Sequence, residues 1–189
     1  SLEIICIGIL RLINNIDYQI CVGFMRLKLK KLKEFSISQS YVDWFSDAET
    51  TRYSDNQYYS FTLEGQKKYV SDCFESEDID LFGIFDRDIH IGNIQISGLS
   101  SVHQRAEISY IVGEKNYWGK GVGSFAVSKI ITKARKFYRL NKLYAGLAEC
   151  NIGSRRVLEK NGFSLEGKRL NHLFYRGKFY DQLDFGLLL

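Results

Sequence analysis

Three alternating glycines between an apolar run and an amphipathic segment form the most informative stretch of this 189-residue chain. They are Gly119, Gly121 and Gly123. Glycine lets the backbone approach a ligand closely, so consecutive N–H groups can point at one oxyanion. If a helix begins here, its first N–H groups have no partner within the helix and lie at the positive end of its dipole. The spacing therefore predicts a phosphate cradle, with the amides of residues 122–124 as donors and a pyrophosphate as occupant.

The segments on either side of the glycines fit such a cradle. Residues 106–112 have the pattern of a strand, and residues 127–138 carry apolar side chains at helical spacing. A P-loop would need Ser or Thr after Gly-Lys, whereas Lys120 is followed by Gly121. A dinucleotide fingerprint would need G-x-G-x-x-G, and this chain has G-x-G-x-G. A glycine-rich turn without a ligand is the plain alternative.

A second polar motif follows another predicted strand, residues 142–148. Asn151 can cap a helix that begins just after it, and Gly162 is well placed to end that helix in the left-handed conformation. Ser154 lies in the first turn of this helix. These structural roles account for Asn151 and Gly162 without any ligand, so the motif is informative mainly in combination with the glycine loop.

Together the two motifs resemble the GCN5-related N-acetyltransferase (GNAT) superfamily. Residues 118–123 are similar to that family's acetyl-CoA pyrophosphate loop, although Trp118 stands where the family usually has Arg or Gln. The sequence of residues 117–121, Tyr-Trp-Gly-Lys-Gly, is similar to the same stretch in the branch of the family that contains the ribosomal-protein alanine acetyltransferases. The resemblance implies an α+β GNAT fold, with a central mixed, mostly antiparallel, splayed sheet flanked by helices.

The resemblance also implies acetyl-CoA as cosubstrate, no metal, and direct acetyl transfer to an amine in a ternary complex. The sheet would splay beside the glycine loop, so that backbone groups of residues 109–112 pair with the pantetheine like an added strand. Asn151 and Ser154 would face the pantetheine and the sulfur. The residues that we expect to contact the cofactor are Ser109, Tyr110, Ile111, Val112, Trp118, Gly119, Lys120, Gly121, Val122, Gly123, Ser124, Asn151, Ser154 and Arg156.

Two residues are candidates for catalysis. An amine attacks only when neutral, so a base or a water chain must remove its proton. Glu107, on the strand before the loop, is the candidate base, and a strand carboxylate without catalytic function is the open alternative. Ser154 matches a serine that the ribosomal-protein branch places near the sulfur, and we expect it to donate a hydrogen bond to the departing thiolate.

Two positions depart from the family pattern. Leu158 stands where many members have a tyrosine that acts as the acid, and Leu173 stands where the ribosomal-protein branch has a glutamate. His172 and Tyr175 are neighbours that could reach the site instead. The acceptor is left open among a protein N-terminus, an amino sugar and a small amine, and a non-catalytic acyl-CoA-binding sensor is the alternative function. A nucleotide-binding Rossmann domain is a more distant alternative.

Composition and charge limit the classes of protein to which this chain can belong. A hydrophobic content of 45% and a charged content of 25% are typical of one soluble globular domain. Residues 116–148 contain no acidic side chain, and their basic residues suit either a solvated helix face or a field near a polyanion. Nucleic-acid binding lacks a recognisable motif. Four scattered cysteines predict a reduced cytoplasmic protein without zinc, no membrane partner is expected, and a homodimer is left open.

The order of elements follows from the remaining patterns. Residues 1–24 are expected to be an extension of uncertain role, and the acetyltransferase domain is expected to span residues 25–189, because residues 25–30 alternate as an edge strand would. The apolar run at 4–10 is too short to cross a bilayer and lacks the signal-peptide pattern. We expect helices at 36–45 and 62–74, strands at 81–85 and 89–96 with a bulge near Gly92, and a tail hairpin turning at 176–178.

Overall fold

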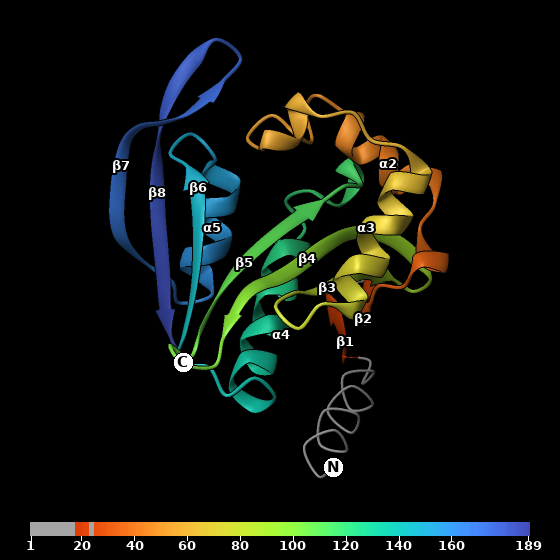
Figure 1. Ribbon diagram of the computed structural model, residues 1–189, viewed down its shortest axis with the longest axis horizontal. Helices are drawn as coiled ribbons and strands as arrows, with labels where there is room; N and C mark the ends of the chain where they lie inside the picture. Colours follow the sequence, from red (N-terminus) through yellow and green to blue (C-terminus); the bar gives the residue numbers. More distant parts are fainter. Residues whose placement is uncertain (1–17, 23–24) are drawn as a thin grey trace.

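The computed structural model describes residues 18–22 and 25–189, which form an α+β fold around one sheet (Figure 1). The strands are β1 (Tyr18–Val22), β2 (Met25–Lys31), β3 (Asp80–Asp86), β4 (Ile89–Ser100), β5 (Arg105–Val112), β6 (Lys142–Ala148), β7 (Ser164–Tyr175) and β8 (Lys178–Leu188). The α-helices are α2 (Gln39–Ser46), α3 (Leu63–Glu75), α4 (Val122–Lys136) and α5 (Ile152–Lys160), and short 3-10 turns are η1 (Glu34–Ser36), η2 (Asp55–Tyr58) and η3 (Lys115–Tyr117).

The sheet is mixed and mostly antiparallel, in the order β1-β2-β3-β4-β5-β6-β8-β7. Its one parallel pair, β5 with β6, is also its weakest junction. These two strands pair over three positions only, from Arg105↔Lys142 to Glu107↔Tyr144, and then diverge. Residues 109–112 pair with β4 on one side, and their other edge faces the gap (Figure 1). The predicted splay beside the glycine loop is therefore confirmed.

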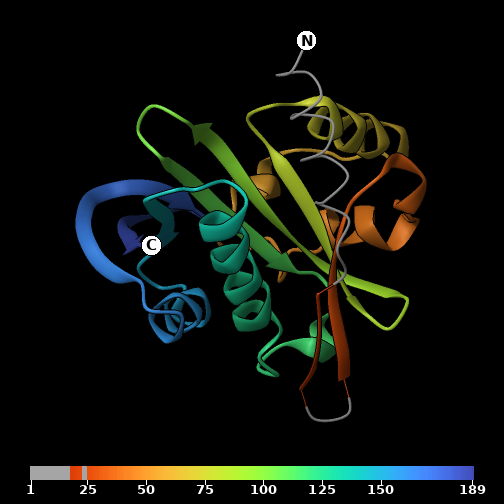
Figure 2. The ribbon, with the colours of Figure 1, turned by 90° about the horizontal axis from the view of Figure 1, so that it is seen from below.

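Helices cover both faces of the sheet (Figure 2). On one face α4 packs its apolar stripe on the strands, and Val127, Ile130 and Ala134 are 0% exposed. On the other face α2 and α3 bury a second cluster that includes Tyr41, Val70 and Leu81. Burying an aliphatic or aromatic side chain contributes about 1.5–3 kcal/mol, so these two layers hold the sheet and the splayed edge in place.

The helix that follows the glycines begins where the sequence predicts. Its N-cap is Gly121, whose φ of 82° is left-handed and costs glycine little. Three basic residues in the last turn are favoured by the helix dipole. Lys133 contradicts the expectation of a basic face exposed to solvent or ligand, because it is 1% exposed, with its ammonium 4.9 Å from the Phe82 ring and 5.2 Å from the Phe137 ring.

The other predicted elements are present with small shifts of their ends. The Thr62 side chain caps α3 by accepting from the Gly65 N–H, and Gly162 ends α5 with a φ of 87°. The bulge in β4 falls at Ile91, one residue before the predicted position, because Ile84 pairs with Gly92 and Phe85 with His90. The tail hairpin turns at residues 176–177, both with positive φ, as a tight hairpin turn requires.

The N-terminal expectation falls partly outside the described residues. Residues 1–17 and 23–24 lie there, and with them the apolar run at 4–10. Tyr18–Val22 forms β1, which pairs antiparallel with β2 at the edge of the sheet. The boundary at Met25 stays a prediction. In the described part of the chain, none of the helices has the length and apolar character needed to span a membrane.

Candidate active site

A cavity of about 890 Å³ opens where β5 and β6 diverge. One part of it is bordered by the glycine loop, the start of α4, the start of α5 and the open edge of β5. The other part lies against α2 and α3 and is bordered by residues of the segment 49–56. The strand edge formed by residues 109–112 is common to both parts, so a ligand in one part can reach a ligand in the other.

The glycine loop presents backbone donors to this cavity. The first hydrogen bond of α4 runs from the Phe125 N–H to the Gly121 carbonyl at 2.9 Å, so the amides of residues 122–124 lie ahead of it at the positive end of the helix. A Cβ at Gly121 would meet no heavy atom within 4 Å, because the loop faces open space. Trp118 anchors the loop to the strand by donating from Nε1 to the Val112 carbonyl at 2.7 Å.

The cavity gathers nearly all the residues expected to contact the cofactor. Ser109, Tyr110, Ile111, Val112, Trp118, Gly119, Gly121, Val122, Gly123, Ser124, Asn151, Ser154 and Arg156 all line it. Lys120 is the exception and does not line the cavity. Lys160, which the sequence also offers, with Arg155 and Arg156, as a residue that could bind the cofactor's phosphates, lies on the same wall as Arg156, one turn further along α5, whereas Arg155 does not line the cavity.

Ser154 is held from two directions. Its backbone N–H donates to the Asn151 side chain at 3.2 Å, which confirms Asn151 as the cap of α5. Its Oγ lies 2.8 Å from the Tyr110 hydroxyl, and that hydroxyl also donates to the Ser154 carbonyl at 3.2 Å. Burial raises the pKa of Tyr110 to about 12, so the phenol keeps its proton. The sequence reasoning missed this side-chain role, because Tyr110 and Ser154 come from separate elements.

Glu107 lies on β5, two residues before Ser109, but it does not line the cavity. It pairs with Ser97 on one side and Tyr144 on the other, where β5 and β6 are still joined. Burial and then the nearby Asp184 carboxylate raise its pKa, and Arg169 opposes them. The cavity wall therefore gives Glu107 no direct contact with a ligand, and its role as base stays a prediction.

The tail residues considered as substitutes lie elsewhere. His172, Leu173 and Tyr175 do not line the cavity. Tyr175 is buried, donates to Asp55 at 3.2 Å and stacks near Tyr58. Leu158 is 1% exposed and belongs to the core, so this position supplies no polar group to the cavity.

The walls of the second part carry side chains that the sequence reasoning did not single out. Asn93 and Gln95 come from β4, and Tyr41 and Tyr69 come from α2 and α3. Apolar and polar residues alternate along β4, and the two carboxamide side chains could have been predicted from this alternation. Ile94 and Ile96 point to the core, so the polar residues between them occupy the opposite face.

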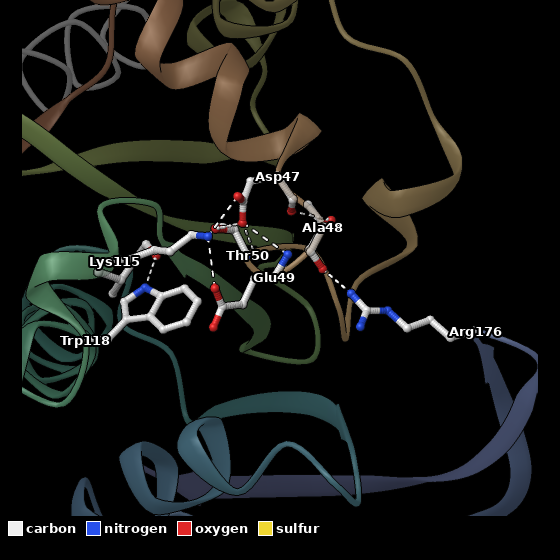
Figure 3. A network of polar contacts seen from close by, with 9 residues as sticks. Asp47, Ala48, Glu49, Thr50, Lys115, Trp118 and Arg176 are labelled. Carbon is white, nitrogen blue, oxygen red and sulfur yellow. Dashed lines mark hydrogen bonds and ion pairs between the residues drawn. The ribbon is translucent and has the colours of Figure 1, made fainter.

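An ion-pair network fixes the outer wall (Figure 3). Lys115 binds Asp47 at 2.8 Å and Glu49 at 2.9 Å, and Arg176, from the turn of the β7–β8 hairpin, donates to the Ala48 carbonyl. Hydrogen bonding to Lys115 holds the pKa of Asp47 well below its usual range. The same contacts raise the pKa of Lys115. The loop after α2 is thus tied to η3 and to the hairpin.

His90 supports the wall from behind. Its Nε2 lies 2.8 Å from the Asn93 Oδ1 and 3.0 Å from the Gly92 carbonyl, so Nε2 carries the hydrogen in the neutral ring. The ring stacks on Phe85 at 4.7 Å, and its buried Nδ1 has no hydrogen-bond partner among the described residues. Burial lowers the pKa of His90, because a second N–H would be left unsatisfied in an apolar site.

We expect His90 to make the fold less stable in acid. Its folded-state pKa lies below the unfolded value of about 6.5, so the unfolded chain takes up the proton first. Stability from the neutral ring is complete above that value and falls, by at most about 1.4 kcal/mol per pH unit, as the pH drops through it. Urea unfolding from pH 8 to pH 5 should show this loss in the wild type and much less of it in His90→Gln.

The exposed His103 provides the control for this measurement. His103→Gln should follow the wild-type pH dependence. Parallel curves for His90→Gln and the wild type would contradict the assignment, whatever their absolute stabilities.

Within residues 18–22 and 25–189, the structure contains no group of three or more His, Cys, Asp or Glu side chains that could hold a metal ion. Cys73 is buried and Cys150 is half-buried, and both are free thiols. The chemistry that the cavity offers therefore comes from backbone amides, hydroxyls, carboxamides and a few charged side chains.

Comparison with known proteins places this arrangement among related sequences and folds. The family model described as an acetyltransferase (GNAT) domain matches residues 26–164. The putative ribosomal N-acetyltransferase YdaF of Bacillus subtilis (strain 168) is 36% identical over 97 residues, which are 51% of this chain and 52% of that protein. The probable N-acetyltransferase YjcK of the same organism is 33% identical over 145 residues, covering 74% of this chain and 77% of that protein.

A solved structure shows the same fold at lower identity. Spermidine N-acetyltransferase from Vibrio cholerae, in complex with CoA and spermine, superposes with a TM-score of 0.76 over 86% of this chain and 95% of that chain. The two sequences are 18% identical, so this likeness is one of fold.

Proposed function

This chain belongs to the GNAT acetyltransferase family, and we propose that it transfers the acetyl group of acetyl-CoA to a primary amine by direct attack in a ternary complex. One observation carries the proposal. A single cavity joins the amide-rich start of α4 and the open edge of β5 to a second compartment against α2 and α3. Two substrates can therefore meet at the strand edge without leaving the protein.

Backbone groups would form the main part of the cofactor site. The amides of residues 122–124 would bind the diphosphate, since they lack helical partners and lie at the positive end of α4. The open edge of residues 109–112 would pair with the pantetheine like an added strand. Arg156 and Lys160, on the cavity wall, would attract the phosphates.

The leaving group would be handled by Ser154 and Tyr110. As the amine nitrogen forms its bond to the acetyl carbon, the carbon–sulfur bond breaks and its electron pair goes to the sulfur. Ser154 would pass its hydroxyl proton to that thiolate, and Tyr110, 2.8 Å from the serine oxygen, would pass its own proton to Ser154. The phenolate would regain a proton through water from the one that leaves the amine, so the products are the amide, the free thiol and an unchanged Tyr110–Ser154 pair. Burial raises the pKa of Tyr110 to about 12, so the phenol holds its proton in the resting protein and would take a proton back readily after the transfer.

The proton released by the amine needs an acceptor. Glu107 does not line the cavity, so it would act through water along the β5 edge. Burial raises its pKa, which brings a carboxylate closer to the range in which a general base is effective.

A non-catalytic acyl-CoA sensor is the second candidate, and Leu158 favours it. The Leu158 side chain is buried in the core, and many family members have at this position a tyrosine that acts as the acid. The Tyr110–Ser154 pair offers another source of protons, which is why we favour the enzyme.

Thiol release from acetyl-CoA, measured across a panel of amines, tests the proposal. We expect turnover with at least one primary amine, and acetyl-CoA binding detectable by calorimetry. Binding without turnover for every amine would support the sensor, and no binding to folded protein would overturn both readings. The cytoplasmic location expected from the sequence stays a prediction.

A further inference from the structure

The second compartment of the cavity is the place from which an acceptor can approach the strand edge. We call it the acceptor chamber and define it by Tyr41, Phe45, Tyr69, Leu81, Asn93 and Gln95. The cofactor, as proposed above, would occupy the compartment beside the glycine loop and α5. The acceptor chamber then meets it at Ser109 and Ile111, which pair with Gln95 and Asn93 on β4.

The acceptor chamber is built from aromatic, aliphatic and carboxamide groups. Tyr41, Leu81 and Asn93 are buried, and Phe45 packs on Phe61 at a ring-centroid distance of 5.1 Å. The one carboxylate on the wall of the whole cavity, as far as the described residues go, is Glu49. Glu49 belongs to the outer wall rather than to the acceptor chamber, and it shares the ammonium of Lys115, at 2.9 Å, with Asp47. The remaining charged lining residues, Arg52, Arg156 and Lys160, are all positive.

The carboxamides are committed to neutral partners. The Gln95 Oε1 accepts from the Tyr69 hydroxyl at 2.5 Å. The Asn93 Oδ1 accepts from the His90 Nε2 at 2.8 Å, and the Asn93 side chain is also hydrogen-bonded to Tyr41. Burial lowers the pKa of His90, and burial raises the pKa of Tyr41 above its ordinary value. Each of these groups therefore stays uncharged, and the wall holds no fixed negative charge for a cation.

Such a wall selects among amines by charge. A polyamine would bring at least one further ammonium group into a chamber whose walls carry no carboxylate, and a charge left unpaired against apolar and neutral walls is costly. The reacting amine itself enters at an advantage, because desolvation favours its neutral and nucleophilic form. An aromatic or aliphatic body would pack against Tyr41, Phe45 and Leu81.

We propose that the acceptor is a primary monoamine with an uncharged aromatic or aliphatic body, of the arylalkylamine type, and that polyamines are poor acceptors. This rests on the acetyl-transfer function proposed above. It separates this chain from the relative whose fold it shares, which was solved with spermine.

The test compares 2-phenylethylamine, spermidine and a short peptide with a free N-terminal alanine. We expect kcat/KM for 2-phenylethylamine to exceed that for the other two by at least about tenfold. Calorimetric Kd values for the same three amines on the CoA-loaded protein should follow the same order. Spermidine or the peptide as the best ligand would overturn the proposal. Amine binding in the expected order without turnover would uphold the acceptor class and defeat the proposed function.

A charge introduced into the acceptor chamber gives a sharper test. Gln95→Glu keeps the size of the side chain and can still accept from Tyr69, but it adds one carboxylate. We expect kcat/KM for spermidine to rise and that for 2-phenylethylamine to fall, each by about tenfold. Gln39→Glu adds the same charge at the exposed start of α2, outside the cavity, and should change neither value. Equal responses of the two variants would overturn the assignment of the chamber.

Discussion

Replacement of Gly121 by alanine is expected to weaken acetyl-CoA binding by about a hundredfold. Gly121 has a φ of 82° and forms the N-cap of α4, so a side chain there strains the backbone that aims the following amides. Loss of two hydrogen bonds to a charged group, at about 1.5 kcal/mol each, corresponds to roughly that factor. Calorimetry with acetyl-CoA measures the effect directly.

Gly177 offers a matched control for this variant. Its φ is 78°, and a Cβ there would also meet nothing within 4 Å, but it lies in the turn of the β7–β8 hairpin, outside the cavity. Both alanine variants should lose about 1 kcal/mol of stability to urea from the left-handed backbone. Only Gly121→Ala should lose the cofactor. A wild-type affinity in Gly121→Ala would rule out the glycine loop as the diphosphate site.

Removal of the Ser154 hydroxyl is expected to lower kcat by about a hundredfold, the scale of general acid catalysis. The substitution Ser154→Ala leaves the backbone N–H that Asn151 caps, so α5 and acetyl-CoA affinity should be retained. Tyr110→Phe should lower kcat by about tenfold, because Tyr110 acts through Ser154. The double variant should be no slower than Ser154→Ala alone, since the two hydroxyls form one path for the proton.

The pH profile separates proton supply from simple packing. Burial raises the pKa of Tyr110 to about 12, so the wild-type phenol stays protonated up to mildly alkaline pH, whereas Tyr110→Phe must take this proton from water and its kcat should fall more steeply as the pH rises. Tyr138→Phe is the control, because Tyr138 is half-buried like Tyr110 and is hydrogen-bonded, to Asp80, yet does not line the cavity. It should cost stability and leave the profile unchanged. Full activity in both Ser154→Ala and Tyr110→Phe would remove the pair from the mechanism.

The ion pairs of the outer wall affect the charge that an acceptor meets on its way to the acceptor chamber. Lys115 pairs with Asp47 and Glu49, and Arg176 reaches the Ala48 carbonyl from the hairpin (Figure 3). These contacts occupy the carboxylate that would otherwise face a cationic acceptor. They also join segments from three parts of the chain, so the outer wall of the cavity depends on the hairpin as well as on the loop after α2.

Local sequence patterns predicted most of the helices and strands, and also the cofactor loop. The glycine spacing, the Asn151 cap and the apolar periodicity after Gly121 depend on neighbours within one or two turns, and the structure has α4 and α5 where those patterns predict them. The splay between β5 and β6 followed from the family resemblance and is present in the pairing. Backbone capping and periodicity are short-range properties, so they can be read without knowing how the elements pack.

Packing between distant elements decided the rest. Tyr110 meets Ser154 across 44 positions of sequence, because α5 packs beside the β5 edge. Asn93 and Gln95 form the acceptor chamber only because the β4 register turns them toward α2 and α3, while the same register leaves Glu107 off the cavity wall. Lys133 is buried against two aromatic rings, although the sequence predicts that this position of α4 is exposed. Which side chains share a compartment is set by strand register and helix packing, and neither is encoded in any single segment.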